Sequence, residues 1–233
     1  MNIVQAMRDP NLFGPHFTGD TWGAWEAFLD ALFALPMSET ALTLYRQHTG
    51  RTAPPAEAFV MAALICGRRA GKSRILGLIA TYLSAFRDYT PYLAPGEVAT
   101  VAVIASDRKQ ARTIFRYISG ALASVPMLAR MVQDETNETI MLSNRVVIEI
   151  ATASFRVTRG YTFAAVLADE TAFWRSDDTS ANPDEEIIKA IRPGLSTIPG
   201  SMLLLASSPY AKRGILYKTF RKYWGQDDAR VLV

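Results

Sequence analysis

Apolar residues along the chain occur either in short unbroken runs or at helical spacing, and the two patterns alternate. Runs of strand length occupy 59–66, 100–105, 163–168 and 202–206. Helical spacing occupies 73–87, 108–125, a segment opened by Pro183, and 214–224. Buried strands that alternate with helices are typical of a mostly parallel sheet covered on both faces. The pattern therefore predicts an α/β fold.

Two further local patterns refine this prediction. The apolar runs 139–142 and 145–151 flank Ser143-Asn144, which is typical of a β-hairpin. Asp107 directly precedes the helix predicted from Arg108, where its side chain can accept a hydrogen bond from the first turn.

The first 50 residues differ from the rest because their aromatic residues recur at helical spacing. This spacing predicts an amphipathic helix that ends at Pro36, and Ser38 is placed to cap a second helix. We predict an N-terminal helical segment over 1–50, acting as a lid, a partner contact or a packing element, and a core over 51–233. The residues with helical spacing are Trp22, Trp25, Phe28, Leu29, Leu32 and Phe33.

Composition excludes several classes of protein. The chain has 233 residues and a single cysteine, Cys66, which rules out an internal disulfide and a cysteine-based metal site. Two histidines are too few for a histidine-rich zinc centre. No apolar run approaches the ~20 residues of a membrane span, so no membrane partner is expected. The net charge of +3 permits a polyanionic partner without requiring one.

A glycine-rich turn joins the first apolar run to the helix that follows it. It reads Gly67-Arg68-Arg69-Ala70-Gly71-Lys72-Ser73. Backbone N–H groups of such a loop and of the helix N-terminus hold polyphosphates. In this P-loop (Walker A) arrangement Lys72 reaches the outer phosphates, Ser73 ligates Mg²⁺, and Gly71 lets the backbone approach closely.

The loop is a variant, because the usual spacing G-x-x-x-x-G-K-S would place a glycine where Cys66 stands. A surface turn that happens to contain Gly-Lys-Ser is the alternative, but the strand before it and the helix after it favour a phosphate site. We interpret Cys66 as a small residue at the end of the strand and not as a catalytic thiol.

Polar side chains also follow the third and fourth apolar runs. Asp169 and Glu170 form a Walker B pattern, in which the first acid holds Mg²⁺ and the second polarises a water aimed at the γ-phosphate. A solvated acidic turn is the alternative, although it does not explain the fully apolar run before the acids. Ser207 and Ser208 are placed to sense the γ-phosphate, unless they simply begin a loop.

Together these segments resemble the ATPase domain of the large terminase subunit, the DNA-packaging motor of tailed bacteriophages. The resemblance spans roughly residues 45–224 and implies a P-loop NTPase fold of the ASCE type. Its matching segments are Gly67–Ser73, Arg159-Gly160, Val166–Glu170 and Ala206–Pro209.

The resemblance implies a role for each site residue. Arg68 contacts or senses the nucleotide, and Arg159 matches a trans-acting arginine finger. Gln47 matches an adenine-contacting glutamine, with a surface glutamine as the alternative. The implied catalytic residues are Glu170, Arg159 and Lys72, and the implied metal ligands are Ser73 and Asp169. The implied nucleotide contacts are Gly67, Arg68, Arg69, Ala70, Gly71, Lys72, Ser73, Gln47, Ser207 and Ser208.

The resemblance further implies ATP and Mg²⁺ as cofactors and a homo-oligomeric ring that moves double-stranded DNA into a procapsid in the host cytoplasm. Its partners would be the portal protein and the small terminase subunit. A nuclease domain follows the ATPase domain in full terminases, and we expect it to be absent from these residues. The alternatives are a helicase-like DNA-dependent ATPase and a nucleotide-binding assembly protein with little turnover.

Two stretches of basic residues are candidates for non-specific contact with DNA phosphates. Neither contains an acidic residue, and a solvated helix face is the alternative for each. The stretches are Arg108, Lys109, Arg112 and Arg116, and Lys212, Arg213, Lys218, Arg221 and Lys222.

Overall fold

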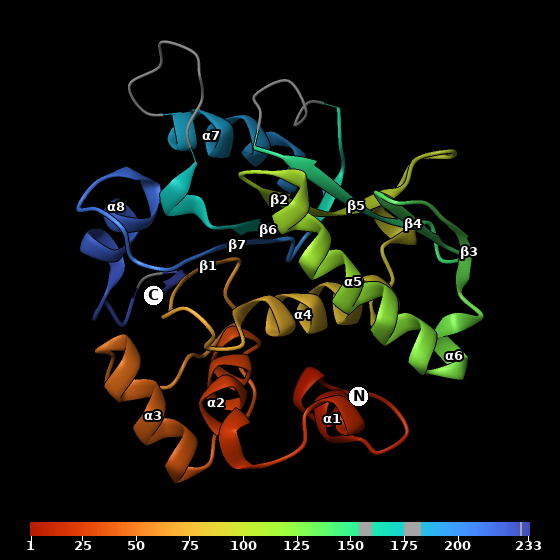
Figure 1. Cartoon of the computed structure of the whole chain (residues 1–233). Helices are drawn as coiled ribbons and strands as arrows, with labels where there is room; N and C mark the ends of the chain where they lie inside the picture. The colour runs from red at the N-terminus through yellow and green to blue at the C-terminus, as the bar shows by residue number, and fades with distance from the viewer. Residues whose placement is uncertain (154–159, 175–182, 229) are drawn as a thin grey trace.

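The computed structural model describes residues 1–153, 160–174, 183–228 and 230–233. Strands in these residues are β1 (Met61–Ile65), β2 (Ala99–Ala105), β3 (Val132–Glu135), β4 (Thr139–Leu142), β5 (Val146–Thr152), β6 (Phe163–Asp169), β7 (Met202–Ser207) and β8 (Val231–Leu232). They form one sheet in the order β3-β4-β5-β2-β6-β7-β1-β8 (Figure 1). In this order, every neighbouring pair from β5 through β2, β6, β7 and β1 to β8 is parallel. At the other edge of the sheet, β3 and β4 are antiparallel to their neighbours. The predicted mostly parallel sheet and the hairpin are confirmed.

Helices cover both faces of this sheet. The α-helices of the described residues are α1 (Ile3–Arg8), α2 (Gly23–Leu32), α3 (Glu39–Thr49), α4 (Lys72–Phe86), α5 (Arg108–Ser124), α6 (Pro126–Ala129), α7 (Pro183–Leu195) and α8 (Gly214–Tyr223). Short 3₁₀ helices span Gly14–His16, Asp20–Trp22, Thr90–Tyr92 and Thr171–Phe173. Figure 1 shows α4 and α5 on one face and α7 and α8 on the other. No helix in the described ranges has both the length and the apolar character needed to cross a bilayer.

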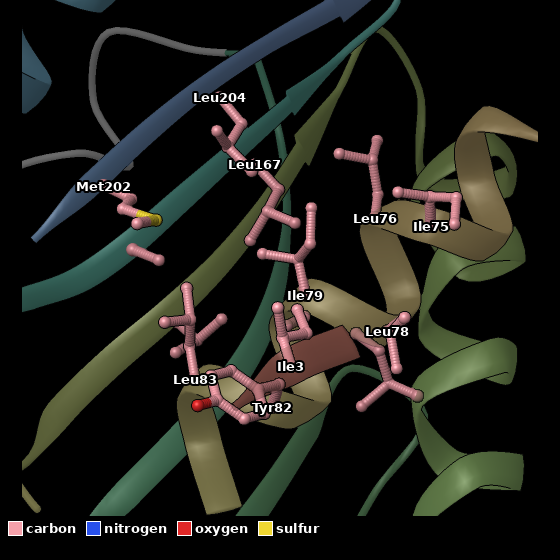
Figure 2. Close-up of a cluster of buried hydrophobic side chains, with 14 of the residues drawn as sticks. Ile3, Ile75, Leu76, Leu78, Ile79, Tyr82, Leu83, Leu167, Met202 and Leu204 are labelled. Atoms are coloured by element: carbon pink, nitrogen blue, oxygen red, sulfur yellow. The ribbon is translucent and has the colours of Figure 1, made fainter. Parts of the chain in front are cut away.

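The central strands are apolar on both faces because both faces are covered. In β1, Ala62 and Leu64 pack with the cluster around α4, while Met61 and Ala63 pack with the cluster around α7 and α8. Side chains alternate between the faces of a strand, so two-sided burial produces the unbroken apolar runs of the sequence. Figure 2 shows Ile79 of α4 beneath the sheet side chain Leu167.

The N-terminal segment belongs to the same hydrophobic core. Ile3, Leu29 and Leu32 are fully buried in the cluster that contains Ile79 and the inner side chains of β6 and β7. Figure 2 shows Ile3 against Ile79 and Tyr82. Of the three roles expected for residues 1–50, packing against the core is therefore present in the fold.

Helix α2 ends earlier than its sequence pattern predicts. It stops at Leu32 and not at Pro36, because Ala34 adopts a left-handed φ of 50° and the chain turns there. Ala34 N–H donates to Ala31 O at 3.1 Å and Leu35 N–H donates to Asp30 O at 2.7 Å. This pair of bonds is a Schellman motif with alanine at the position that glycine usually occupies. The predicted cap of α3 is confirmed, since Ser38 accepts from Ala41 N–H.

We expect Ala34→Gly to raise the free energy of unfolding by about 0.5 kcal/mol, because a left-handed φ costs an L-residue more than glycine loses in chain entropy. Urea denaturation measures the change. The control is Ala24→Gly in the first turn of α2, which should lower stability by about 0.5–1 kcal/mol. Equal losses in the two variants would contradict the left-handed turn at residue 34.

Candidate nucleotide-binding site

Three segments that were predicted separately meet at one edge of the sheet. The glycine-rich loop follows β1, the acid pair ends β6, and the serine pair ends β7, the strand between them. Ile65 is in register with Ser207, and Asp169 with Ala206. The carboxyl ends of parallel strands are where open α/β sheets bind their ligands.

Lys72 joins the loop to the acid pair directly. Its Nζ lies 2.8 Å from Asp169 Oδ1 and 2.7 Å from Glu170 Oε1. Lys72 and Asp169 are buried, with 7% and 4% of their surfaces exposed. The cation and the two carboxylates thus compensate one another in a place from which water is largely excluded.

The surroundings of the three groups shift their pKa values in different directions. Burial alone would lower the pKa of Lys72, but hydrogen bonding and charge from Asp169 and Glu170 raise it overall, so the ammonium stays charged. Burial raises the pKa of Asp169 despite the neighbouring Lys72. Burial also opposes ionisation of Glu170, yet Lys72, the Ser207 hydroxyl and the Ser208 N–H outweigh it and lower the pKa of that carboxyl.

Glu170 is held from the side opposite Lys72 by the end of β7. Its Oε2 accepts from Ser207 Oγ at 2.9 Å and from Ser208 N–H at 3.3 Å. Ser207 Oγ also accepts from Ala172 N–H, so one hydroxyl links the loops after β6 and β7. Glu170 has a left-handed φ of 52°, a conformation that non-glycine residues adopt at a cost and that clusters at functional sites. The turn is further fixed by the Trp174 indole N–H, which donates to Asp169 O.

The glycine-rich loop lies beside this cluster. Residues 68–70 are exposed, and Arg69 and Gly71 have left-handed φ values of 64° and 90°. Helix α4 begins at Lys72, so its positive N-terminal end faces the same place. A chain that winds in this way around a helix N-terminus is suited to a polyphosphate.

The residues present also fit Mg²⁺. Ser73 in the first turn of α4 and Asp169 are oxygen ligands of the type and number that Mg²⁺ takes from a protein when phosphates and water complete its shell. Asp169 Oδ1 is buried, and its close contact among the described residues is with the Lys72 ammonium at 2.8 Å. Those residues contain no group of three or more His, Cys, Asp or Glu side chains placed around a metal.

A pocket of about 520 Å³ lies next to the loop, between α2, α3 and β1. It has the size of a small-molecule site. Its walls include Trp25, Phe28, Leu44, Tyr45, His48, Ile65, Cys66 and Ala70. Gln47 is exposed on α3, where its neighbours Leu44, Tyr45 and His48 provide the wall, so its contact with adenine stays a prediction. The roles of Tyr45 and His48 in this wall were not predicted from the sequence.

The remaining predicted residues are placed as follows. Arg68 and Arg69 are exposed on the loop. Arg159 lies outside the described residues. Burial raises the pKa of the partly buried Cys66 to about 11, which agrees with a neutral thiol and not a nucleophile.

The two basic stretches are partly paired with acids from other elements. Arg108 and Arg112 of α5 lie 3.4 and 3.7 Å from Glu138 Oε1, and Lys218 of α8 contacts Glu185 of α7. Arg108, Arg112 and Lys218 nevertheless keep half or more of their side-chain surface exposed. Contact with DNA stays a prediction for both stretches.

No protein-family model and no curated protein matches this chain. Solved structures match it in shape. The HK97 bacteriophage large terminase superposes with a TM-score of 0.60 over 92% of this chain at 16% identity. A variant of the ATPase domain of the Thermus phage P74-26 large terminase gives 0.55 over 83% at 16% identity. This chain has the fold of a phage large terminase ATPase domain.

A third large terminase, from a thermophilic bacteriophage, was solved in complex with ATP-γ-S and gives a TM-score of 0.52 over 84% of this chain at 15% identity. The chain spans 43% of the HK97 terminase and 73% of the P74-26 ATPase domain. At these identities the likeness establishes the terminase ATPase fold.

Proposed function

We propose that this chain is the ATPase motor domain of a viral large terminase, which hydrolyses ATP with Mg²⁺ to move double-stranded DNA into a procapsid. One observation carries the proposal: Lys72, at the end of a glycine-rich loop, contacts both carboxylates at the end of β6. The large terminase of the thermophilic bacteriophage, which shares the fold, was solved with ADP and with ATP-γ-S, which supports a nucleotide as the ligand.

Binding of the triphosphate follows from the loop and the pocket beside it. The loop N–H groups and the N-terminus of α4 would hold the phosphates, and the apolar pocket next to Ala70 would take the base. Lys72 would exchange its two carboxylates for phosphate oxygens. Because one anionic partner replaces another, the buried ammonium keeps a counter-charge throughout.

Hydrolysis requires a water placed in line with the γ-phosphate, and Glu170 is the group that would orient it. A carboxyl whose pKa is lowered is a weak proton acceptor, so Glu170 acts mainly by holding the water through hydrogen bonds. Mg²⁺, held by Ser73 and Asp169, would neutralise phosphate charge when bound. A change in the position of Glu170 would be passed to β7 through Ser207, since the Ser207 hydroxyl contacts both Glu170 and the loop after β6.

The motor itself needs more than one subunit. In this proposal Arg159 of a neighbouring subunit completes the site within a homo-oligomeric ring. The exposed basic residues of α5, of α8 and of the segment just before α8 contact DNA without reading its sequence. The portal protein and the small terminase subunit are the other partners, and the host cytoplasm is the location.

The test is MgATP hydrolysis measured against protein concentration, with and without linear double-stranded DNA. We expect specific activity to rise with concentration, because the arginine comes from a neighbour, and Arg159→Ala to remove that rise. Detectable turnover that is flat with concentration would reject the trans-acting arginine while keeping the ATPase. Failure to bind MgATP in calorimetry would reject the ATPase.

A further inference from the structure

Two tryptophans of the N-terminal segment contact the phosphate-binding loop. The Trp25 indole Nε1 donates a 2.8 Å hydrogen bond to Ala70 O, which lies 45 residues later in the chain. The Trp22 ring covers Gly71 so closely that a Cβ added there would lie 3.1 Å from it. Figure 1 places α2 beside the loop that joins β1 to α4.

The bond from Trp25 determines which way the next N–H group of the loop points. Peptide bonds in the described residues are trans, so the Ala70 carbonyl and the Gly71 N–H point in opposite directions. By holding the carbonyl toward α2, Trp25 directs the Gly71 N–H away from α2. This N–H has no acceptor among the described residues, and it directly precedes Lys72 and the N-terminus of α4.

Helix α2 is fixed firmly enough to orient the loop. Leu29 and Leu32 of α2 are fully buried in the core. The Trp25 ring packs edge-on against Phe28, with centroids 5.8 Å apart. Directly before α2, the Trp22 ring centroid lies 5.2 Å from the Arg74 guanidinium, and this contact joins the N-terminal segment to the first turn of α4.

We propose that Trp25 is a positioning residue for the phosphate-binding loop: it holds the Ala70–Gly71 peptide in the orientation that offers the Gly71 N–H to a phosphate. The inference rests on the proposed nucleotide function and extends it to the N-terminal segment, which becomes part of the phosphate site. Glycine at 71 leaves this peptide free to rotate, with a φ of 90°, so an external contact is needed to keep one orientation.

The experiment compares wild type and Trp25→Phe by calorimetry, with MgATPγS and magnesium tripolyphosphate as separate probes. Phenylalanine keeps an aromatic ring and removes the indole donor. We expect both probes to bind about 3- to 10-fold more weakly, the range expected for one lost hydrogen bond. The matched control is Trp224→Phe, which removes an indole bond to His48 O away from the phosphate-binding loop and should leave the affinity for tripolyphosphate unchanged.

The second probe separates the loop from the base pocket, because Trp25 also lines that pocket. Tripolyphosphate has no base, so a loss confined to MgATPγS would show that Trp25 acts through the pocket and would overturn the proposal. If each probe binds Trp25→Phe with the same affinity as wild type, the proposal is also overturned, while the proposed function stands. If wild type binds neither probe, the proposed function and the inference both fail.

A further measurement on wild type does not depend on the folding of the variant. We expect hydrogen exchange of the Trp25 indole N–H, followed by ¹⁵N NMR, to slow when tripolyphosphate binds, because the loop then opens less often. An exchange rate that tripolyphosphate leaves unchanged would contradict the coupling of Trp25 to the phosphate site.

Discussion

Glu170→Gln is expected to lower the rate of MgATP hydrolysis by about 100-fold or more, the range typical of a group that orients or activates the attacking water. The amide is nearly isosteric and can still accept from the Ser207 hydroxyl and the Ser208 N–H that hold Glu170 now. It lacks the negative charge and the acceptor strength needed to hold a polarised water. The affinity for MgATPγS should therefore stay within about threefold of wild type.

Single-turnover hydrolysis and calorimetry together check this prediction. The matched control is Glu185→Gln on α7, which makes the same chemical change where the carboxylate contacts Lys218 outside the site. We expect this control to hydrolyse ATP at the wild-type rate. A Glu170→Gln protein with undiminished turnover would assign the water-orienting role to another group and would favour a nucleotide-binding protein whose turnover does not use the acid pair.

Lys72→Met is expected to weaken MgATPγS binding by about 100-fold, because hydrogen bonds between charged groups are the strongest contacts in a phosphate site. It should also destabilise the fold at pH 8 by about 3 kcal/mol, since breaking a buried ion pair leaves Asp169 without a cation. The control is Lys109→Met, an exposed lysine of α5, which should change neither property.

The stability loss in Lys72→Met should depend on pH with a definite sign. Burial already raises the pKa of Asp169 in the folded state, and removal of Lys72 raises it further. The folded variant then binds a proton more tightly than the unfolded chain does, so its stability falls as pH rises toward the folded-state pKa of Asp169. Lys72→Met should therefore be closer to wild type at pH 5 than at pH 8.

Urea denaturation at the two pH values measures this dependence. Adding Asp169→Asn to Lys72→Met removes the uncompensated charge and should restore most of the stability at pH 8, but not nucleotide binding. Equal stability losses at both pH values, with no recovery in the double variant, would show that Lys72 contributes packing and not charge compensation.

The elements predicted correctly from the sequence are those whose burial in the folded protein produces a recognisable pattern of apolar residues. β1, β2, β6 and β7 are buried on both faces, so their unbroken apolar runs identify them. β3 was missed because Val132–Glu135 is largely polar and lies at the sheet edge, where burial imposes no pattern. α1 and α6 were missed because helices of six and four residues carry too little periodicity.

For the candidate site, sequence order identified the loop, the acids and the serines, because each follows a buried strand. It did not reveal the acids that partly neutralise the basic stretches. Glu138, which pairs with Arg108 and Arg112, lies between β3 and β4, and Glu185, which pairs with Lys218, lies on α7. Ion pairs between residues far apart in the chain cannot be predicted from the local composition of a basic stretch.

Local pattern alone was enough to predict a parallel α/β domain with a phosphate loop, an acid pair and a serine pair at strand ends, because two-sided burial leaves unbroken apolar runs. The contacts within the site came only from the folded chain: Lys72 bridges both acids, Ser207 and Ser208 hold Glu170, and Trp25 bonds to the loop. These contacts join residues 37 to 98 positions apart, and their proximity depends on the order of strands in the sheet, which no local periodicity records.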